Sequence, residues 1–82
     1  MKSILGELRG EIRIKENTAL HANVAGNVLL DPEVMLEIHG VVIGDITISA
    51  NAFCTVYGRV IGDIHNAGGL SVHGIVNGRI VE

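Results

Sequence analysis

Ring-bearing polar residues recur at one position of this sequence at nearly constant spacing. They are His21, His39, Tyr57 and His73, with Leu5 at the head of the series. If the intervening segments stack as β-strands, equivalent side chains lie about 4.8 Å apart, so His21 and His39 could bind one metal ion, as imidazole pairs bind zinc. No carboxylate or cysteine completes a ligand set in this series, and zinc usually has three or four protein ligands. We therefore predict an exposed ladder of stacked rings, in which neighbouring imidazoles resist joint protonation and weaken association toward about pH 6.

Two aspartates occupy a second recurring position. The full series is Glu11, Asn27, Asp45, Asp63 and Arg79. Carboxylates on neighbouring coils resemble the acid pairs of glycosidases and of calcium sites. Both aspartates, however, directly follow a glycine at a predicted corner, where a short carboxylate favours hydrogen bonds with nearby backbone N–H groups. The pattern therefore predicts a structural role in the turn.

The only cysteine shares its repeat position with aliphatic residues. Cys54 corresponds to Leu36 and Leu70, which predicts a buried and inert thiol. A nucleophilic cysteine needs a basic or helix-N-terminal setting, and the sequence offers neither. One cysteine also cannot form an internal disulfide, so we expect a reducing, cytoplasmic setting.

Bulky side chains fall in two longer predicted corners. Met35 and Phe53 are expected to pack on each other there, and beside Val34 they could instead form a small docking patch. No P-loop, dinucleotide-binding fingerprint or Ser-His-Asp set is present. We expect no catalytic residue, no cofactor and no metal. The enzymatic alternative is a relative of hexapeptide acyltransferases or solenoid carbonic anhydrases, with the histidine series as its site.

A short repeat must position all of these residues. It is clearest from Leu36 to Ile48, where aliphatic residues alternate around Gly40 and Gly44. The second glycine of each copy falls at spacings of 16, 18, 18 and 16, namely at Gly10, Gly26, Gly44, Gly62 and Gly78. A period this short, made of β-branched residues and glycine, is typical of a β-solenoid.

Alignment of the five copies gives three columns that are aliphatic throughout. The first is Ile4, Leu20, Ile38, Val56 and Val72; the second is Leu8, Val24, Val42, Val60 and Val76; the third is Ile12, Val28, Ile46, Ile64 and Ile80. Residues two apart in a strand share a face. These columns are therefore predicted to fill the interior of each coil.

Glycines mark two corners of each coil, and chain length varies only at the third. Residues 30–38 and 48–56 span eight positions, whereas residues 14–20 and 66–72 span six. No stretch has a sustained apolar stripe of helical period. We predict that residues 1–82 form a single all-β domain, a right-handed β-solenoid (β-helix) of about five short, three-faced coils, roughly 24 Å tall at about 4.8 Å per coil.

Composition limits the partners of such a fold. The net charge is −3 and the six basic residues are scattered singly, which gives no electrostatic surface for nucleic acid. No apolar run approaches the roughly 20 residues of a membrane span, and charge follows the N-terminus too soon for a signal peptide. We expect no direct membrane insertion, so that any membrane association runs through partners.

The ends of the predicted solenoid are the main candidate site. Each end coil presents unpaired backbone groups and the end of an apolar column, which is adhesive unless capped, and we expect the short terminal segments not to cap it. The residues predicted to mediate self-association are Ile4, Leu8, Ile12, Val72, Val76 and Ile80. The alternative is a monomer whose terminal turns and charges block the ends.

The repeat resembles that of the bactofilins, a family of polymer-forming bacterial cytoskeletal proteins. The resemblance rests on residues 40–46 and 58–64, with looser copies at 6–12 and 74–80, and covers about four fifths of the chain. It implies a right-handed β-helix that joins end to end into nucleotide-free filaments and acts as a scaffold for envelope or division proteins. More weakly, residues 70–79 are similar to the C-terminal β-helix of the division-site inhibitor MinC. That similarity implies the alternative of a small dimeric binding or regulatory module, or one of immunity type.

Overall fold

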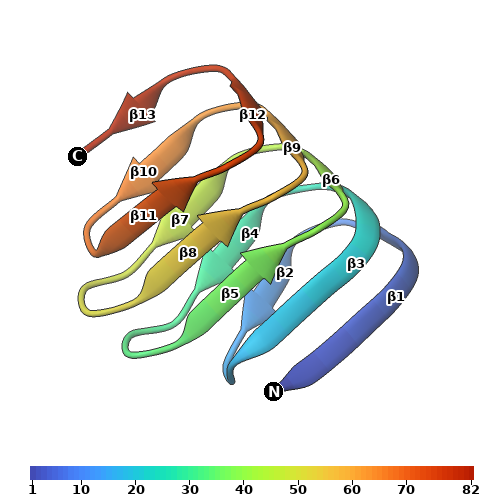
Figure 1. Cartoon of the computed structure of the whole chain (residues 1–82), viewed down its shortest axis with the longest axis horizontal. Helices are drawn as coiled ribbons and strands as arrows, with labels where there is room; N and C mark the ends of the chain where they lie inside the picture. The colour runs from blue at the N-terminus through green and yellow to red at the C-terminus, as the bar shows by residue number, and fades with distance from the viewer.

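The computed structural model describes all 82 residues and contains thirteen strands and no helix. The strands wind as a right-handed solenoid of five coils (Figure 1), as the repeat predicts. Coil 1 comprises β1 (Lys2–Arg9) and β2 (Ile12–Ile14), and coil 2 comprises β3 (Thr18–Ala25) and β4 (Val28–Leu30). The later coils have three strands each: β5 (Met35–Ile38), β6 (Val41–Ile43) and β7 (Ile46–Ile48); β8 (Phe53–Val56), β9 (Arg59–Ile61) and β10 (Ile64–Asn66); β11 (Gly69–Val72), β12 (Ile75–Asn77) and β13 (Ile80–Val81).

All strand pairs are parallel and join successive coils. One sheet has the order β11-β8-β5-β3-β6-β9-β12, with β1 paired to β3, and the other has the order β13-β10-β7-β4-β2. The register brings each predicted column together, as in the pairing of Leu8 with Val24, Val24 with Val42 and Val42 with Val60. The three aliphatic columns are therefore confirmed.

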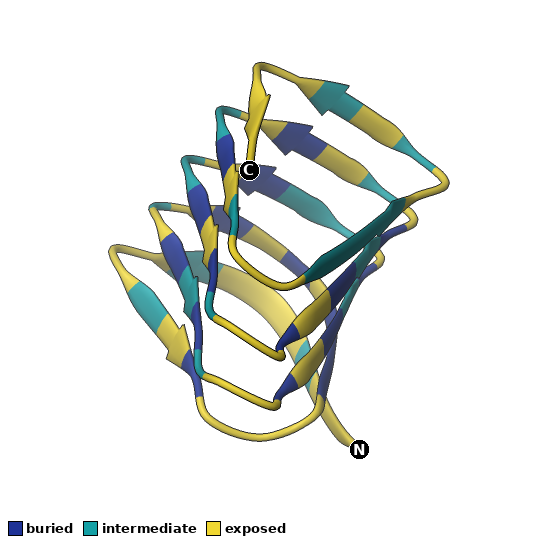
Figure 2. Ribbon diagram, turned by 90° about the vertical axis from the view of Figure 1, so that its left-hand side faces the viewer, coloured by how far each residue is buried: buried dark blue, intermediate teal, exposed yellow.

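The columns fill the interior with one hydrophobic cluster of 17 buried residues. Burial is complete in the middle coils, where Ile38, Val42 and Ile46 have no exposed surface. It decreases toward both ends of the stack (Figure 2), because an end coil has a neighbour on one side only. The structure contains no helix that is long and apolar enough to cross a membrane.

Glycine is required at the corners because successive backbones approach closely there. A Cβ atom at Gly58 would overlap the carbonyl group of Gly40 in the preceding coil, and one at Gly62 would overlap that of Gly44. The first corner differs from the prediction in coils 1 and 2. In these two coils β1 and β3 continue through the corner as unbroken strands of eight residues. In coil 2, Ala22 stands at the position of the corner glycine.

The third corner carries the length variation, as predicted. The two longer connections run between β4 and β5 and between β7 and β8. In each, one residue turns the chain with a positive φ, Glu33 at 66° and Asn51 at 64°. These two residues lie 18 positions apart and are equivalent in the repeat.

Candidate functional site

A ladder of four rings runs along one edge of the solenoid, as the sequence predicts. His21 and His39 are stacked with ring centroids 4.4 Å apart and planes 7° from parallel. Tyr57 follows at 4.9 Å from His39, and His73 at 5.3 Å from Tyr57. The spacing follows that of the strands, so the backbone alone brings these rings into contact.

The stacking geometry does not favour a shared metal ion. Parallel rings direct their nitrogen lone pairs side by side, whereas two ligands of one metal must aim at a common point. The ring nitrogens have nearer partners: Nε2 of His39 lies 3.1 Å from the Glu37 carboxylate, and Nε2 of His73 lies 3.2 Å from the Ser71 hydroxyl. No group of three or more His, Cys, Asp or Glu side chains is placed to hold a metal.

A second ladder is formed by the residues that follow the second corner glycine. Oδ1 of Asn27 accepts the N–H of Asp45 at 2.9 Å, Oδ1 of Asp45 accepts the N–H of Asp63 at 3.0 Å, and Oδ1 of Asp63 accepts the N–H of Arg79 at 2.9 Å. The predicted backbone-binding role is confirmed, but each bond joins one coil to the next instead of closing a local turn. Each of these side-chain oxygens therefore forms a hydrogen bond with the backbone of the following coil.

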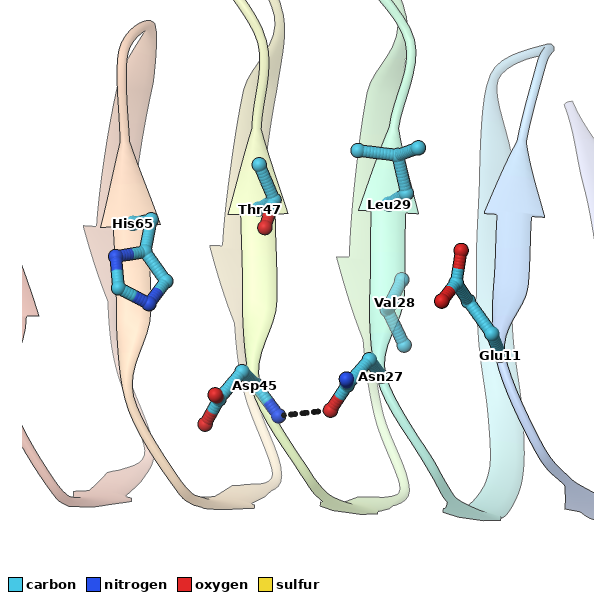
Figure 3. A pocket seen from close by; sticks show the side chains of 7 residues that line it. All are labelled: Glu11, Asn27, Val28, Leu29, Asp45, Thr47 and His65. Atoms are coloured by element: carbon cyan, nitrogen blue, oxygen red, sulfur yellow. Dashed lines mark hydrogen bonds between the residues drawn. The ribbon is translucent and has the colours of Figure 1, made fainter.

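A shallow depression beside this ladder gathers the polar side chains of the face formed by β2, β4, β7 and β10 (Figure 3). Its volume is about 190 Å³, and its lining includes Glu11, Asn27, Asp45, Thr47 and His65. The side chains of Asn27 and Asp45 lean toward the next coil, where their oxygens accept N–H groups. Two free carboxylates do not converge here on a point where a substrate atom could lie, so the arrangement lacks the paired acids of a glycosidase.

The thiol of Cys54 is fully buried between Leu36 and Leu70, its register partners. Burial raises the pKa of this thiol to about 12, because the charged thiolate would lose its hydration. A thiol that stays protonated at neutral pH is a poor nucleophile. The prediction of a buried, inert cysteine is confirmed.

The prediction that Met35 and Phe53 lie in the long corners is wrong. Each begins a strand, the two are register partners, and both are partly exposed. The ring of Phe53 covers Gly69 in the next coil, where a Cβ atom would overlap it. Val34 is buried in the core, so it contributes nothing to a docking patch.

The two end coils expose the residues that the sequence assigns to self-association. At the N-terminal end Ile4, Leu8 and Ile12 are partly buried and line an open hollow of about 400 Å³. At the C-terminal end Val72 and Ile80 are 40% and 47% exposed, and Val76 is partly buried. β1 and β2 are hydrogen-bonded on one side only, as are β11, β12 and β13.

Two features of these surfaces were not predicted from the sequence. Oδ1 of Asn17 accepts the N–H of Met35 at 2.9 Å in the next coil. The equivalent residues of the later coils are Met35, Phe53 and Gly69, so no repeated asparagine or aspartate signals this bond. Four of the six basic residues also belong to coil 1 and its exit, namely Lys2, Arg9, Arg13 and Lys15.

Comparisons with protein-family models, with curated proteins and with solved structures found no match to this chain.

Proposed function

We propose that this chain is a non-enzymatic bacterial scaffold element of the bactofilin type, which self-associates through the ends of its solenoid into oligomers or filaments. The observation that carries the proposal is the pair of open ends. Each combines unpaired strand edges with the exposed end of an aliphatic core, and such edges pair readily with another chain. Stacking of a further coil would satisfy the backbone groups and bury the apolar columns together.

The contacts of the aspartates, the histidines and the cysteine support a structural role. The aspartates hold backbone N–H groups, the imidazoles stack on one another, and the thiol is buried. An active site needs groups left free to meet a substrate in a concave pocket. In this proposal the protein works in the cytoplasm and reaches the membrane through partners of the envelope or division machinery.

A second candidate is supported by a different surface. On the face formed by β6, β9 and β12 the register partners Ile43 and Ile61 are 54% and 38% exposed. Ile75, which is 49% exposed, and Val41 lie on the same face, on either side of exposed Arg59. Clustered exposed aliphatic residues mark interaction surfaces. This face would suit a binding or regulatory module that forms a fixed dimer side by side.

Sedimentation velocity over a wide concentration range, combined with negative-stain images, separates the two candidates. Under the end-to-end proposal the wild-type chain forms particles that grow with concentration. Leu8→Lys and Val76→Lys disperse them because each places a charge on an end column, while Ile43→Lys leaves them intact. Circular dichroism must show retained β structure in all three variants, whereas Val42→Lys, in the middle of the core, unfolds the protein.

Two outcomes would contradict end-to-end assembly. One is a chain that sediments as a monomer at every concentration. The other is a particle of fixed size that Ile43→Lys disperses and the end variants do not, which would favour the side-by-side dimer.

A further inference from the structure

Asn77 and Gly78 form the only asparagine–glycine pair of the chain, at the second corner of coil 5. Both residues are exposed. Every other asparagine precedes threonine, valine or alanine. Glycine has no Cβ atom, so its backbone nitrogen is not shielded from the side chain of the residue before it. The pair therefore joins a side-chain amide to an accessible backbone nitrogen.

The peptide group between the two residues is held by a hydrogen bond at one end only. Its carbonyl oxygen, which belongs to Asn77, accepts the N–H of Gly62 at 2.9 Å. Its N–H, which belongs to Gly78, has no acceptor within the chain. The corner glycines Gly44 and Gly62 each donate this N–H to the following coil at 2.9 Å, and no further coil pairs with coil 5.

The other asparagines are held more firmly. The peptide group that follows Asn27 is bonded at both its carbonyl and its N–H, at 2.9 Å and 2.8 Å, and Oδ1 of the same residue accepts the N–H of Asp45. The N–H groups that follow Asn51 and Asn66 donate to backbone carbonyls at 3.1 Å and 2.9 Å. Asn77 alone combines exposure, a following glycine and a free N–H.

We propose that Asn77 is a site of spontaneous covalent modification, at which the side-chain amide becomes a carboxylate through a succinimide ring. The nitrogen of Gly78 bonds to Cγ of Asn77 and gives up its proton, and ammonia leaves as the ring closes. Water then opens the ring at either carbonyl, which yields aspartate or isoaspartate. The reaction consumes one water, releases one ammonia and takes the net charge from −3 by one unit to −4.

Ring closure requires the peptide group after Asn77 to turn toward Cγ, because the extended backbone of a strand holds the two reacting atoms apart. The turn breaks the hydrogen bond from Gly62 and no other. In an inner coil the bond from the N–H must break as well. Coil 5 also has a neighbour on one side only, and such end segments open locally at low cost.

Isoaspartate changes the coil more than aspartate does, because it adds one carbon atom to the main chain. Two hydrogen bonds lie just beyond the corner. The N–H of Arg79 donates to Oδ1 of Asp63 at 2.9 Å, and the carbonyl of Arg79 accepts the N–H of Ile64 at 2.8 Å. A longer main chain displaces both partners, so that β13 separates from β10, its only neighbour. This inference does not depend on the proposed function.

Peptide mapping after incubation in water labelled with heavy oxygen locates the reaction. The chain is kept at a concentration where it is monomeric, so that coil 5 stays uncovered. Each event during incubation raises the mass by about 3 Da, because the new oxygen comes from the labelled water. Asn77 should react at least about fivefold faster than every other asparagine of the folded chain. An equal or faster reaction at another asparagine would overturn the proposal.

Ile61→Asn is the matched control, because residue 61 is the register partner of Asn77, is exposed and precedes Gly62. The variant repeats the asparagine–glycine pair in coil 4, where both ends of the peptide group are bonded, with Gly44 and with Asn77. The introduced asparagine should react at least about fivefold more slowly than Asn77 in the same molecule. Equal rates in a variant with native circular dichroism would overturn the structural argument. If the variant does not fold, wild type in urea decides: unfolding should accelerate the other asparagines more than Asn77, and equal acceleration would overturn it.

Hydrogen exchange on the modified chain tests the effect on coil 5. The amide protons of Gly62 and Ile64 should lose protection in the isoaspartate product, since their acceptors lie on either side of the longer main chain. Asn77→Asp supplies the charge without the additional main-chain atom and should keep that protection. Unchanged protection in the isoaspartate product would show that β13 stays in place and would overturn this part of the proposal, whereas the site of modification is decided by the mapping.

Discussion

Coil 3 and the two end coils carry the same types of residue at equivalent positions, but these residues differ in how far they are buried. Val42 in coil 3 and Val76 in coil 5 occupy one column, yet Val42 is fully buried and Val76 only partly. The middle coil meets neighbours above and below, whereas each end coil meets one. The comparison teaches that residue type builds the stack and that position along the stack decides which residues remain available for contact. The predictions below test this difference, beginning with the largest effect.

Alanine at a corner glycine should distinguish the middle from the end most strongly. Gly58→Ala puts a Cβ atom onto the carbonyl group of Gly40. The backbone of Gly40 cannot rotate away as a side chain could. The free energy of unfolding should therefore fall by at least about 3 kcal/mol. Gly10→Ala meets no atom and carries only the strain of its φ of 88°, about 1 to 2 kcal/mol. Urea unfolding at a concentration where the protein is monomeric measures both. Equal losses would mean that close coil approach does not determine glycine at these corners.

The buried thiol allows a comparison of medium size at alkaline pH. Burial raises the pKa of Cys54 to about 12 from 9.0. The folded state therefore holds this proton more tightly, so the thiol's contribution to stability is complete below pH 9 and falls as the pH rises toward 12. Proton linkage gives a loss of about 1.4 kcal/mol by pH 10.

Two variants isolate this effect. Cys54→Val removes the alkaline loss, because valine does not titrate. Adding Ile80→Cys to that variant places a thiol at a position that is 47% exposed, and little alkaline loss should return. Denaturant unfolding at pH 7 and pH 10 measures the difference. An equal loss of stability from the thiol at position 80 would show that the end coil excludes water as well as the middle coils do.

The fold could be read from the sequence because the repeat fixes it many times over. Three aliphatic columns, two corner glycines and one variable corner all require the same register, and a slip of one residue would turn every aliphatic side chain outward. The ring ladder followed from that register directly. The same logic predicted the burial of Cys54 from its alignment with Leu36 and Leu70.

Features that depend on single contacts could not be read in this way. Whether Oδ1 of Asp45 turns to its own corner or to the next coil depends on atomic positions that a column alignment lacks. The column alignment places Phe53 in a long corner, and it does not show that Gly69, which has no side chain, leaves space for the ring. The unbroken course of β1 and β3 likewise depends on backbone torsions, although Ala22 in place of a glycine was visible in the sequence.

The smallest effect concerns the long corners, which join the middle coils and are absent between coils 1 and 2 and between coils 4 and 5. Glu33 and Asn51 occupy equivalent positions with nearly equal positive φ angles of 66° and 64°. Asparagine tolerates this conformation better than glutamate does, because its short side chain can bond the local backbone. Glu33→Asn should therefore raise the free energy of unfolding by about 0.5 kcal/mol, and Asn51→Glu should lower it by a similar amount. Both variants are measured by urea unfolding, and the double exchange should leave stability near that of wild type. Because the two corners share one geometry, opposite and nearly equal shifts are required, and shifts of the same sign would mean that contacts outside the backbone decide the residue at this turn.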